Sequence, residues 1–72
     1  MSKTKHIDDY KKFMPFLALR SMRAAELCGT TIETIDSRIH EMMKLVNVSS
    51  RGSLLAWCIK FGAVDINDVV IE

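Results

Sequence analysis

Apolar residues recur at helical spacing through the middle of the chain. Between residues 31 and 46 they follow one another at steps of three, four, three, one and three, on one face of a helix, at Ile32, Ile35, Ile39, Met42, Met43 and Val46. The opposite face collects polar side chains, namely Glu33, Asp36, Ser37, His40, Glu41 and Lys44. The pattern predicts an amphipathic helix from about Thr31 to Val46, with one buried and one exposed side.

Signals for helix ends precede this helix. Gly29 accepts the left-handed conformation that closes a helix, so a shorter helix that contains Ala25 is expected to stop there. Thr30 and Glu33 have the spacing of a T-x-x-E capping box, which satisfies free backbone amides at the start of the next helix. The order of short helix, tight turn and longer amphipathic helix predicts a helix-turn-helix.

Two further segments show helical patterns. A first helix over residues 7–17 is predicted by the spacing of Ile7, Tyr10, Phe13, Met14 and Leu17. Pro15 leaves two alternatives, a kink at the end of that helix or the first turn of a second helix over residues 16–28. Ser50 is suited to cap a last helix from about Arg51 to Phe61, closed by Gly62. The segment after it fits an extra turn or an extended strand.

These elements fit one small domain. The 72 residues have room for one core, and a chain with 49% apolar and 26% charged residues is typical of folded globular proteins. We expect a flexible N-terminus over residues 1–6, an all-α helix-turn-helix domain over residues 7–62 and a C-terminal tail over residues 63–72. The last helix is apolar on more than one side, which predicts a homodimer interface made of Leu54, Leu55, Trp57, Cys58 and Phe61.

The cysteines, the histidines and the net charge limit the kinds of functional site that we expect in this chain. Cys28 and Cys58 lie in apolar helical patterns without a matching pair of histidines, which indicates buried, reduced thiols and a cytoplasmic location. His6 and His40 have no nucleophile or ligand set beside them, so we expect no enzyme, no metal and no cofactor. No stretch fits a membrane span. The net charge of +1 is low for a nucleic-acid-binding protein.

The spacing of one group of residues resembles that of a known family. The residues of this group are Thr34, Ile35, Arg38, Met42, Val46, Asn47, Val48 and Arg51, followed by Leu55, Ala56, Trp57 and Gly62. This run resembles the C-terminal helix-turn-helix of the LuxR type, which also occurs as stand-alone domains resembling GerE. The spacing agrees without a gap from Ala25 to Gly62, about half of the chain. Before Ala25 the family's usual acidic first helix is not recognisable.

This resemblance implies a fold of four helices and a function. The second helix is the scaffold, Thr31–Val46 is the recognition helix in the major groove, and Arg51–Phe61 is the helix through which such domains often pair. The protein is then a small transcriptional regulator that binds double-stranded DNA as a dimer on a roughly palindromic site. The expected DNA-binding residues are Thr31, Thr34, Ser37, Arg38, His40, Lys44 and Arg51, with Arg20 and Arg23 as further phosphate contacts.

Acidic residues in the predicted recognition helix favour an alternative. Glu33 and Asp36 stand where the family commonly carries lysines, and carboxylates facing a polyanion weaken binding, although they can accept a hydrogen bond from cytosine. The alternative is a protein-binding adaptor or anti-activator that keeps the helix-turn-helix fold and binds a regulator or RNA polymerase. Glu33 and Asp36 also suit the first turn of any helix, and Arg38 has the spacing of a surface ion pair with Glu41.

Overall fold

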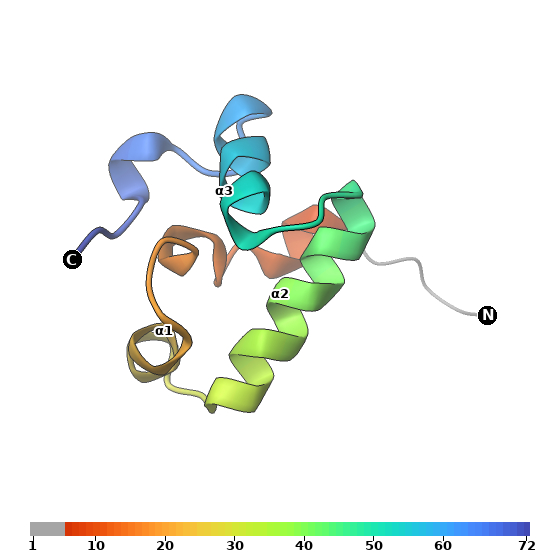
Figure 1. The fold of residues 1–72 in the computed structure, drawn as a ribbon. Coiled ribbons are helices and arrows are strands. Elements are labelled where there is room, and N and C mark those ends of the chain that lie inside the picture. Colours follow the sequence, from red (N-terminus) through yellow and green to blue (C-terminus); the bar gives the residue numbers. More distant parts are fainter. Residues whose placement is uncertain (1–5) are drawn as a thin grey trace.

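The computed structural model of the chain describes residues 6–72, so most of the predicted flexible N-terminus, residues 1–5, lies outside the described residues. Residues 6–72 form three α-helices, three short 3-10 helices and no strand, which confirms an all-α fold. In chain order the elements are η1 (Ile7–Tyr10), η2 (Met14–Phe16), α1 (Ser21–Cys28), α2 (Ile32–Val46), α3 (Arg51–Lys60) and η3 (Ile66–Asp68). Figure 1 shows α2 along one side of the molecule, with α1 beside its first turns and α3 beside its last turns.

The N-terminal segment does not form the regular helix predicted over residues 7–17. η1 and η2 replace it, and Pro15 lies in the first turn of η2. In an α-helix Pro15 would have no N–H for the carbonyl of Lys11, and its ring would collide with that carbonyl. The alternative helix over residues 16–28 is also wrong, because α1 begins only at Ser21. The described residues therefore contain three α-helices where four were predicted.

The core nevertheless draws on this irregular segment as well as on the helices. Tyr10, Met14 and Leu17 are each no more than 3% exposed. They pack in one cluster with the buried faces of the three α-helices and with the segment after α3. Its other buried members are Leu19, Ala24, Ala25, Ile35, Ile39, Met42, Leu54, Cys58 and Val64.

A closed turn at Gly29 joins α1 to α2. Gly29 has a φ of 69°, and the amides of Gly29 and Thr30 donate to the carbonyls of Glu26 and Ala25 at 3.3 and 2.9 Å. This pair of bonds is a Schellman motif, which ends α1 at Cys28 as predicted. In Figure 1 α1 is seen nearly along its axis while α2 lies across the view, so the chain changes direction at this turn.

The cap of α2 lies one residue later than the T-x-x-E pattern predicts. Thr31 is the N-cap, and its hydroxyl oxygen accepts a hydrogen bond from the amide of Thr34 at 3.2 Å. The amide of Thr30, which a capping box would offer to the Glu33 carboxylate, instead completes the Schellman motif at the end of α1. The predicted capping box of Thr30 with Glu33 is therefore wrong, and α2 begins at Ile32.

The ends of α3 follow the predicted signals. The Ser50 hydroxyl oxygen accepts a hydrogen bond from the amide of Ser53 at 3.1 Å, which is an N-cap. The helix ends at Lys60, one residue earlier than predicted, and Gly62 follows with a φ of 74°. Between α2 and α3 the chain reverses at Asn47, which adopts the left-handed conformation with a φ of 58°.

The C-terminal tail returns along the molecule to the N-terminal segment. It contains one short turn, η3, followed by extended residues. The amide of Val70 donates to the carbonyl of Pro15 at 2.8 Å, and Glu72 forms an ion pair with Arg23 of α1 at 2.9 Å. The tail thus contacts two segments that lie far from it in the sequence.

Candidate functional site

The outward face of α2 is mostly polar, and the apolar residues Ile32 and Leu45 are also exposed near the two ends of the helix. Ile35, Ile39 and Met42 are buried against the core, so the opposite face of the same helix is turned to solvent. Its exposed members are Glu33, Asp36, Ser37, His40 and Lys44. Three of the predicted DNA-binding residues, Ser37, His40 and Lys44, are therefore together on one accessible surface, interleaved with the two carboxylates.

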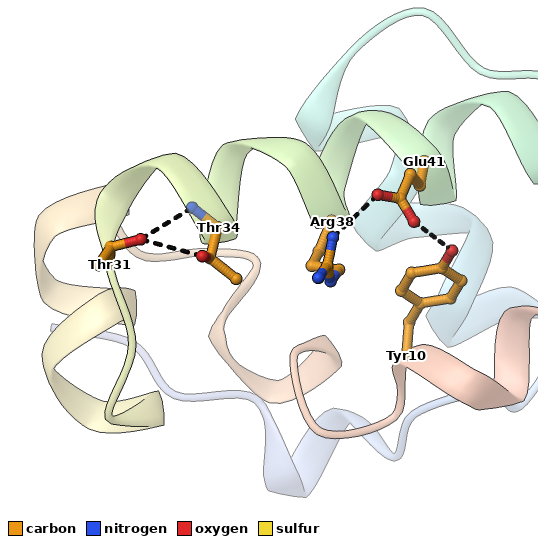
Figure 2. Close-up of polar contacts among 5 residues, drawn as sticks. All are labelled: Tyr10, Thr31, Thr34, Arg38 and Glu41. Carbon is orange, nitrogen blue, oxygen red and sulfur yellow. Dashed lines mark hydrogen bonds and ion pairs between the residues drawn. The ribbon is translucent and has the colours of Figure 1, made fainter.

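A second group of polar residues follows one flank of α2. Figure 2 shows Thr31, Thr34, Arg38 and Glu41 in succession along this flank, with Tyr10 approaching Glu41 from η1. Thr31 and Thr34 bond each other at the helix start, since the Thr31 hydroxyl donates to the Thr34 hydroxyl oxygen at 2.9 Å. Both predicted DNA contacts therefore also serve the N-cap of α2.

Arg38 and Glu41 form the ion pair that their spacing predicts. Nη1 of Arg38 donates to Oε2 of Glu41 at 3.0 Å, and the hydroxyl of Tyr10 donates to Oε1 of the same carboxylate at 2.7 Å. The hydrogen bond to Glu41, with burial and the carboxylate charge, raises the pKa of Tyr10 to about 12. Sequence reasoning missed Tyr10, because its partner is 31 residues away and the bond exists only in the folded chain.

Arg51, which the sequence predicts as a phosphate contact, is bonded to groups of its own chain. Its Nε donates to the carbonyl of Leu17 at 3.2 Å, Nη2 to the carbonyl of Leu19 at 2.6 Å and Nη1 to the Ser21 hydroxyl at 3.1 Å. All three guanidinium nitrogens are thus engaged inside the molecule. They hold the start of α3 to the segment that leads into α1, which is a structural role.

Asp36 takes part in the same network. Its Oδ1 accepts a hydrogen bond from the Ser21 hydroxyl at 2.6 Å, and that hydroxyl oxygen accepts from Arg51. Three α-helices therefore meet through one serine side chain. This makes Asp36 a packing residue between α1 and α2 as well as a surface acid, whereas Glu33 is simply exposed.

The other two predicted phosphate contacts lie on the side of the C-terminal tail. Nε of Arg23 donates to both carboxylate oxygens of Glu72, at 3.0 and 2.9 Å, and this raises the pKa of Arg23. Arg20 lies beside them in a surface pocket of about 260 Å³, lined also by Ala18 and Leu19. Both side chains of the ion pair are more than 40% exposed, so the pair contributes little to stability.

The predicted dimer interface divides into buried and exposed parts. Leu54 and Cys58 are 0% exposed and belong to the core of the same chain, so they are not available to a second copy. Leu55 and Trp57 are partly exposed, and Phe61 is 62% exposed. The rings of Trp57 and Phe61 are in contact, with centroids 4.8 Å apart. A dimer contact through α3 therefore depends on these three residues and stays a prediction.

The cysteines and the charged residues form no further site in the part of the chain that the structure describes. Cys28 is partly buried and Cys58 fully buried, both are unpaired, and burial raises the pKa of both thiols. Within residues 6–72 no three His, Cys, Asp or Glu side chains gather as metal ligands would. None of the helices in this range has the length and apolar character to cross a membrane.

Comparison with protein-family models, with curated proteins and with solved structures gives no match to this chain. Geometry, charge and hydrogen bonding around α2 are therefore the basis for assigning a function. Most of the predicted DNA-binding residues lie on one surface, made of the outward face and the Arg38 flank of α2.

Proposed function

We propose that the chain is a small DNA-binding transcriptional regulator of the LuxR or GerE type, with α2 as the recognition helix. The observation that carries this proposal is the accessible polar face of a helix that follows α1 after a three-residue turn. In helix-turn-helix proteins the first helix crosses the DNA backbone and the second enters the major groove, with its N-terminal half toward the bases. A cytoplasmic location fits this function.

Within this proposal the contacts divide by chemistry. Ser37 and His40 face outward from the middle of α2 and are suited to base edges. Arg38 offers the guanidinium fork that pairs with guanine. Lys44, in the last turn, is suited to a phosphate.

The charge pattern sets the expected strength of binding. With Arg51 engaged internally and Glu33 exposed on the contact face, few phosphates are neutralised. The logarithm of the binding constant changes with the logarithm of the salt concentration by about −0.9 for each neutralised phosphate. We therefore expect binding to random duplex at low salt, with a shallow salt dependence compared with strongly basic regulators.

A titration with random duplex at several salt concentrations tests the proposal. Glu33→Lys reverses one exposed charge on the contact face and should strengthen binding and steepen the salt dependence. Asp68→Lys makes the same change in net charge on η3 and is the matched control, with a smaller expected effect. Asp36 is left unchanged, because its replacement would also break the bond from Ser21. Absence of binding by the wild type at low salt would contradict the proposal.

A second candidate function is supported by the engaged arginines. Arg51 bonds carbonyls, and Arg23 and Arg38 bond carboxylates, while Glu33 remains exposed. A helix-turn-helix with this face suits a basic surface of a protein, such as a regulator or RNA polymerase. For this function Glu33→Lys should abolish capture of a purified partner, whereas for DNA binding it should increase duplex affinity. The two functions thus predict opposite results for one variant.

The proposed DNA-binding form is a homodimer that pairs through α3. Leu55, Trp57 and Phe61 supply its partly exposed apolar surface. Phe61→Glu places a charge in this surface and should shift the sedimentation equilibrium toward monomer. Asn67→Glu adds the same charge at an exposed position of η3, and as the control it should have little effect. A wild-type chain that sediments as a monomer at high concentration would contradict pairing.

A further inference from the structure

Two arginines predicted to bind DNA differ sharply in how much of the guanidinium is engaged. Arg51 donates from Nε, Nη1 and Nη2 to groups inside the molecule. Arg38 donates from Nη1 to Glu41, and no other hydrogen bond joins its guanidinium to a side chain or carbonyl within residues 6–72. An arginine carries five N–H donors, and a guanine contact needs two of them. Arg38 therefore keeps enough donors to bind a base.

The partner of Arg38 is itself held from a second side. Oε2 of Glu41 accepts from Arg38, while Oε1 accepts from the hydroxyl of Tyr10, which is only 2% exposed. Figure 2 shows Glu41 between the two side chains, with Tyr10 reaching up from η1. A carboxylate bonded by two groups on different elements has little freedom to rotate. It restrains the arginine more than an ordinary surface ion pair does.

From this geometry we propose that Glu41 and Tyr10 are positioning residues, which hold Arg38 in a fixed orientation for bidentate recognition of guanine in the major groove. The inference rests on the proposed DNA-binding function and names the chemistry of one contact in it. Arginine has a large rotamer entropy, and part of it is already lost before DNA arrives if Glu41 holds the side chain. Arg38 then contributes specificity, whereas Lys44 contributes general affinity.

The opposite role for Glu41 gives the opposite prediction. If Glu41 only neutralises Arg38, its removal frees a positive charge and strengthens binding to every duplex alike. If Glu41 positions Arg38, its removal weakens binding to the preferred sequence and leaves binding to random duplex unchanged or slightly stronger. The ratio of the two affinities separates these roles, and a loss of stability alone does not change that ratio.

The test begins with selection of a preferred duplex from a random library by the wild-type chain. Affinities for the selected duplex and for random duplex are then measured at the same salt concentration for Glu41→Gln, Tyr10→Phe and Arg38→Lys. A bidentate base contact corresponds to roughly 5- to 150-fold in discrimination. We expect Arg38→Lys to lose this factor because lysine keeps the charge without the fork. Glu41→Gln should lose most of it and Tyr10→Phe a smaller part.

Glu33→Gln is the matched control, because it removes one carboxylate from the same helix and has no arginine partner within the described residues. It should raise both affinities together and leave their ratio unchanged. The inference is overturned if Glu41→Gln behaves like Glu33→Gln, or if the wild type binds duplex without any sequence preference. The first of these results leaves the proposed function intact. Absence of duplex binding by the wild type would instead remove the proposed function and the inference with it.

Discussion

The N-terminal segment, residues 6–20, and the three-helix segment, residues 21–62, bury apolar side chains equally well but fold by different local rules. Met14 of the first segment and Met42 of the second are both 0% exposed. The first segment has short 3-10 turns around Pro15, whereas the second has α-helices with a cap or a left-handed residue at most ends. Apolar spacing therefore predicts burial in both segments, whereas capping residues predict helix boundaries only where they are present.

The difference also extends to the candidate site. The three-helix segment carries the outward face of α2, and the N-terminal segment supplies Tyr10, which bonds Glu41 on the flank of that helix. The irregular segment is thus in contact with the candidate site. The N-terminal segment contributes to stability through the packing of its buried side chains. Substitutions in the two segments measure how much each contributes to the free energy of unfolding.

The largest expected effect on stability comes from truncating the two fully buried methionine side chains, one in each segment. Met14→Ala and Met42→Ala each leave a cavity in the core and should lower the free energy of unfolding by about 2–5 kcal/mol. Urea denaturation followed by the fluorescence of Trp57 measures both. If Met14→Ala lowers the free energy of unfolding much less than Met42→Ala does, the two segments are not equally part of the core, and the N-terminal segment is peripheral to it.

A smaller loss is expected when the bonds between the two segments are cut. Arg51→Met removes the donors to the carbonyls of Leu17 and Leu19 and should lower stability by roughly 1–3 kcal/mol, since partly buried carbonyls lose their partners. Lys60→Met, at the exposed end of the same helix, is the control and should change little. If Arg51→Met left thermal stability unchanged but weakened DNA binding, Arg51 would be a phosphate contact after all.

Substitutions of two glycines test whether the left-handed residue after α1 is needed to end that helix. Gly29→Ala forces a side chain into the left-handed region at φ 69° and should lower stability by about 1–2 kcal/mol. Gly52→Ala, within α3 and with nothing near its added Cβ, should instead raise stability by about 0.4–1 kcal/mol. Thermal denaturation of both variants shows whether each substitution raises or lowers stability. If both change stability in the same direction, Gly29 is not needed to end α1.

A further effect is confined to alkaline pH. The pKa of Tyr10 is about 12 in the folded chain and about 10 when the chain is unfolded, so its contribution to stability is complete below pH 10. It is lost as the pH rises from about 10 to about 12, because the unfolded chain releases the proton first. Tyr10→Phe should flatten this part of the stability profile relative to the wild type. An unchanged profile would mean that the bond to Glu41 is not formed in solution.

Much of the fold follows from short-range signals in the sequence. Gly29, Ser50 and Gly62 mark real helix ends, and the stripe through Ile35, Ile39 and Met42 is the buried side of α2. The same spacing places Ser37, His40 and Lys44 outward, so the accessible face of the candidate site was predictable. These features depend on residues within one or two helical turns of each other, and local geometry is enough to determine them.

Tertiary structure decided everything that depends on distant partners. Whether Thr30 or Thr31 capped α2 depended on the turn that ends α1, and the bonds that Arg51 forms depended on the positions of the carbonyls of residues 17 and 19. The bond from Tyr10 to Glu41 joins residues 31 positions apart. The sequence determined which side chains are able to bond, and only the packed chain determined which of them meet, because a hydrogen bond forms only within about 3 Å.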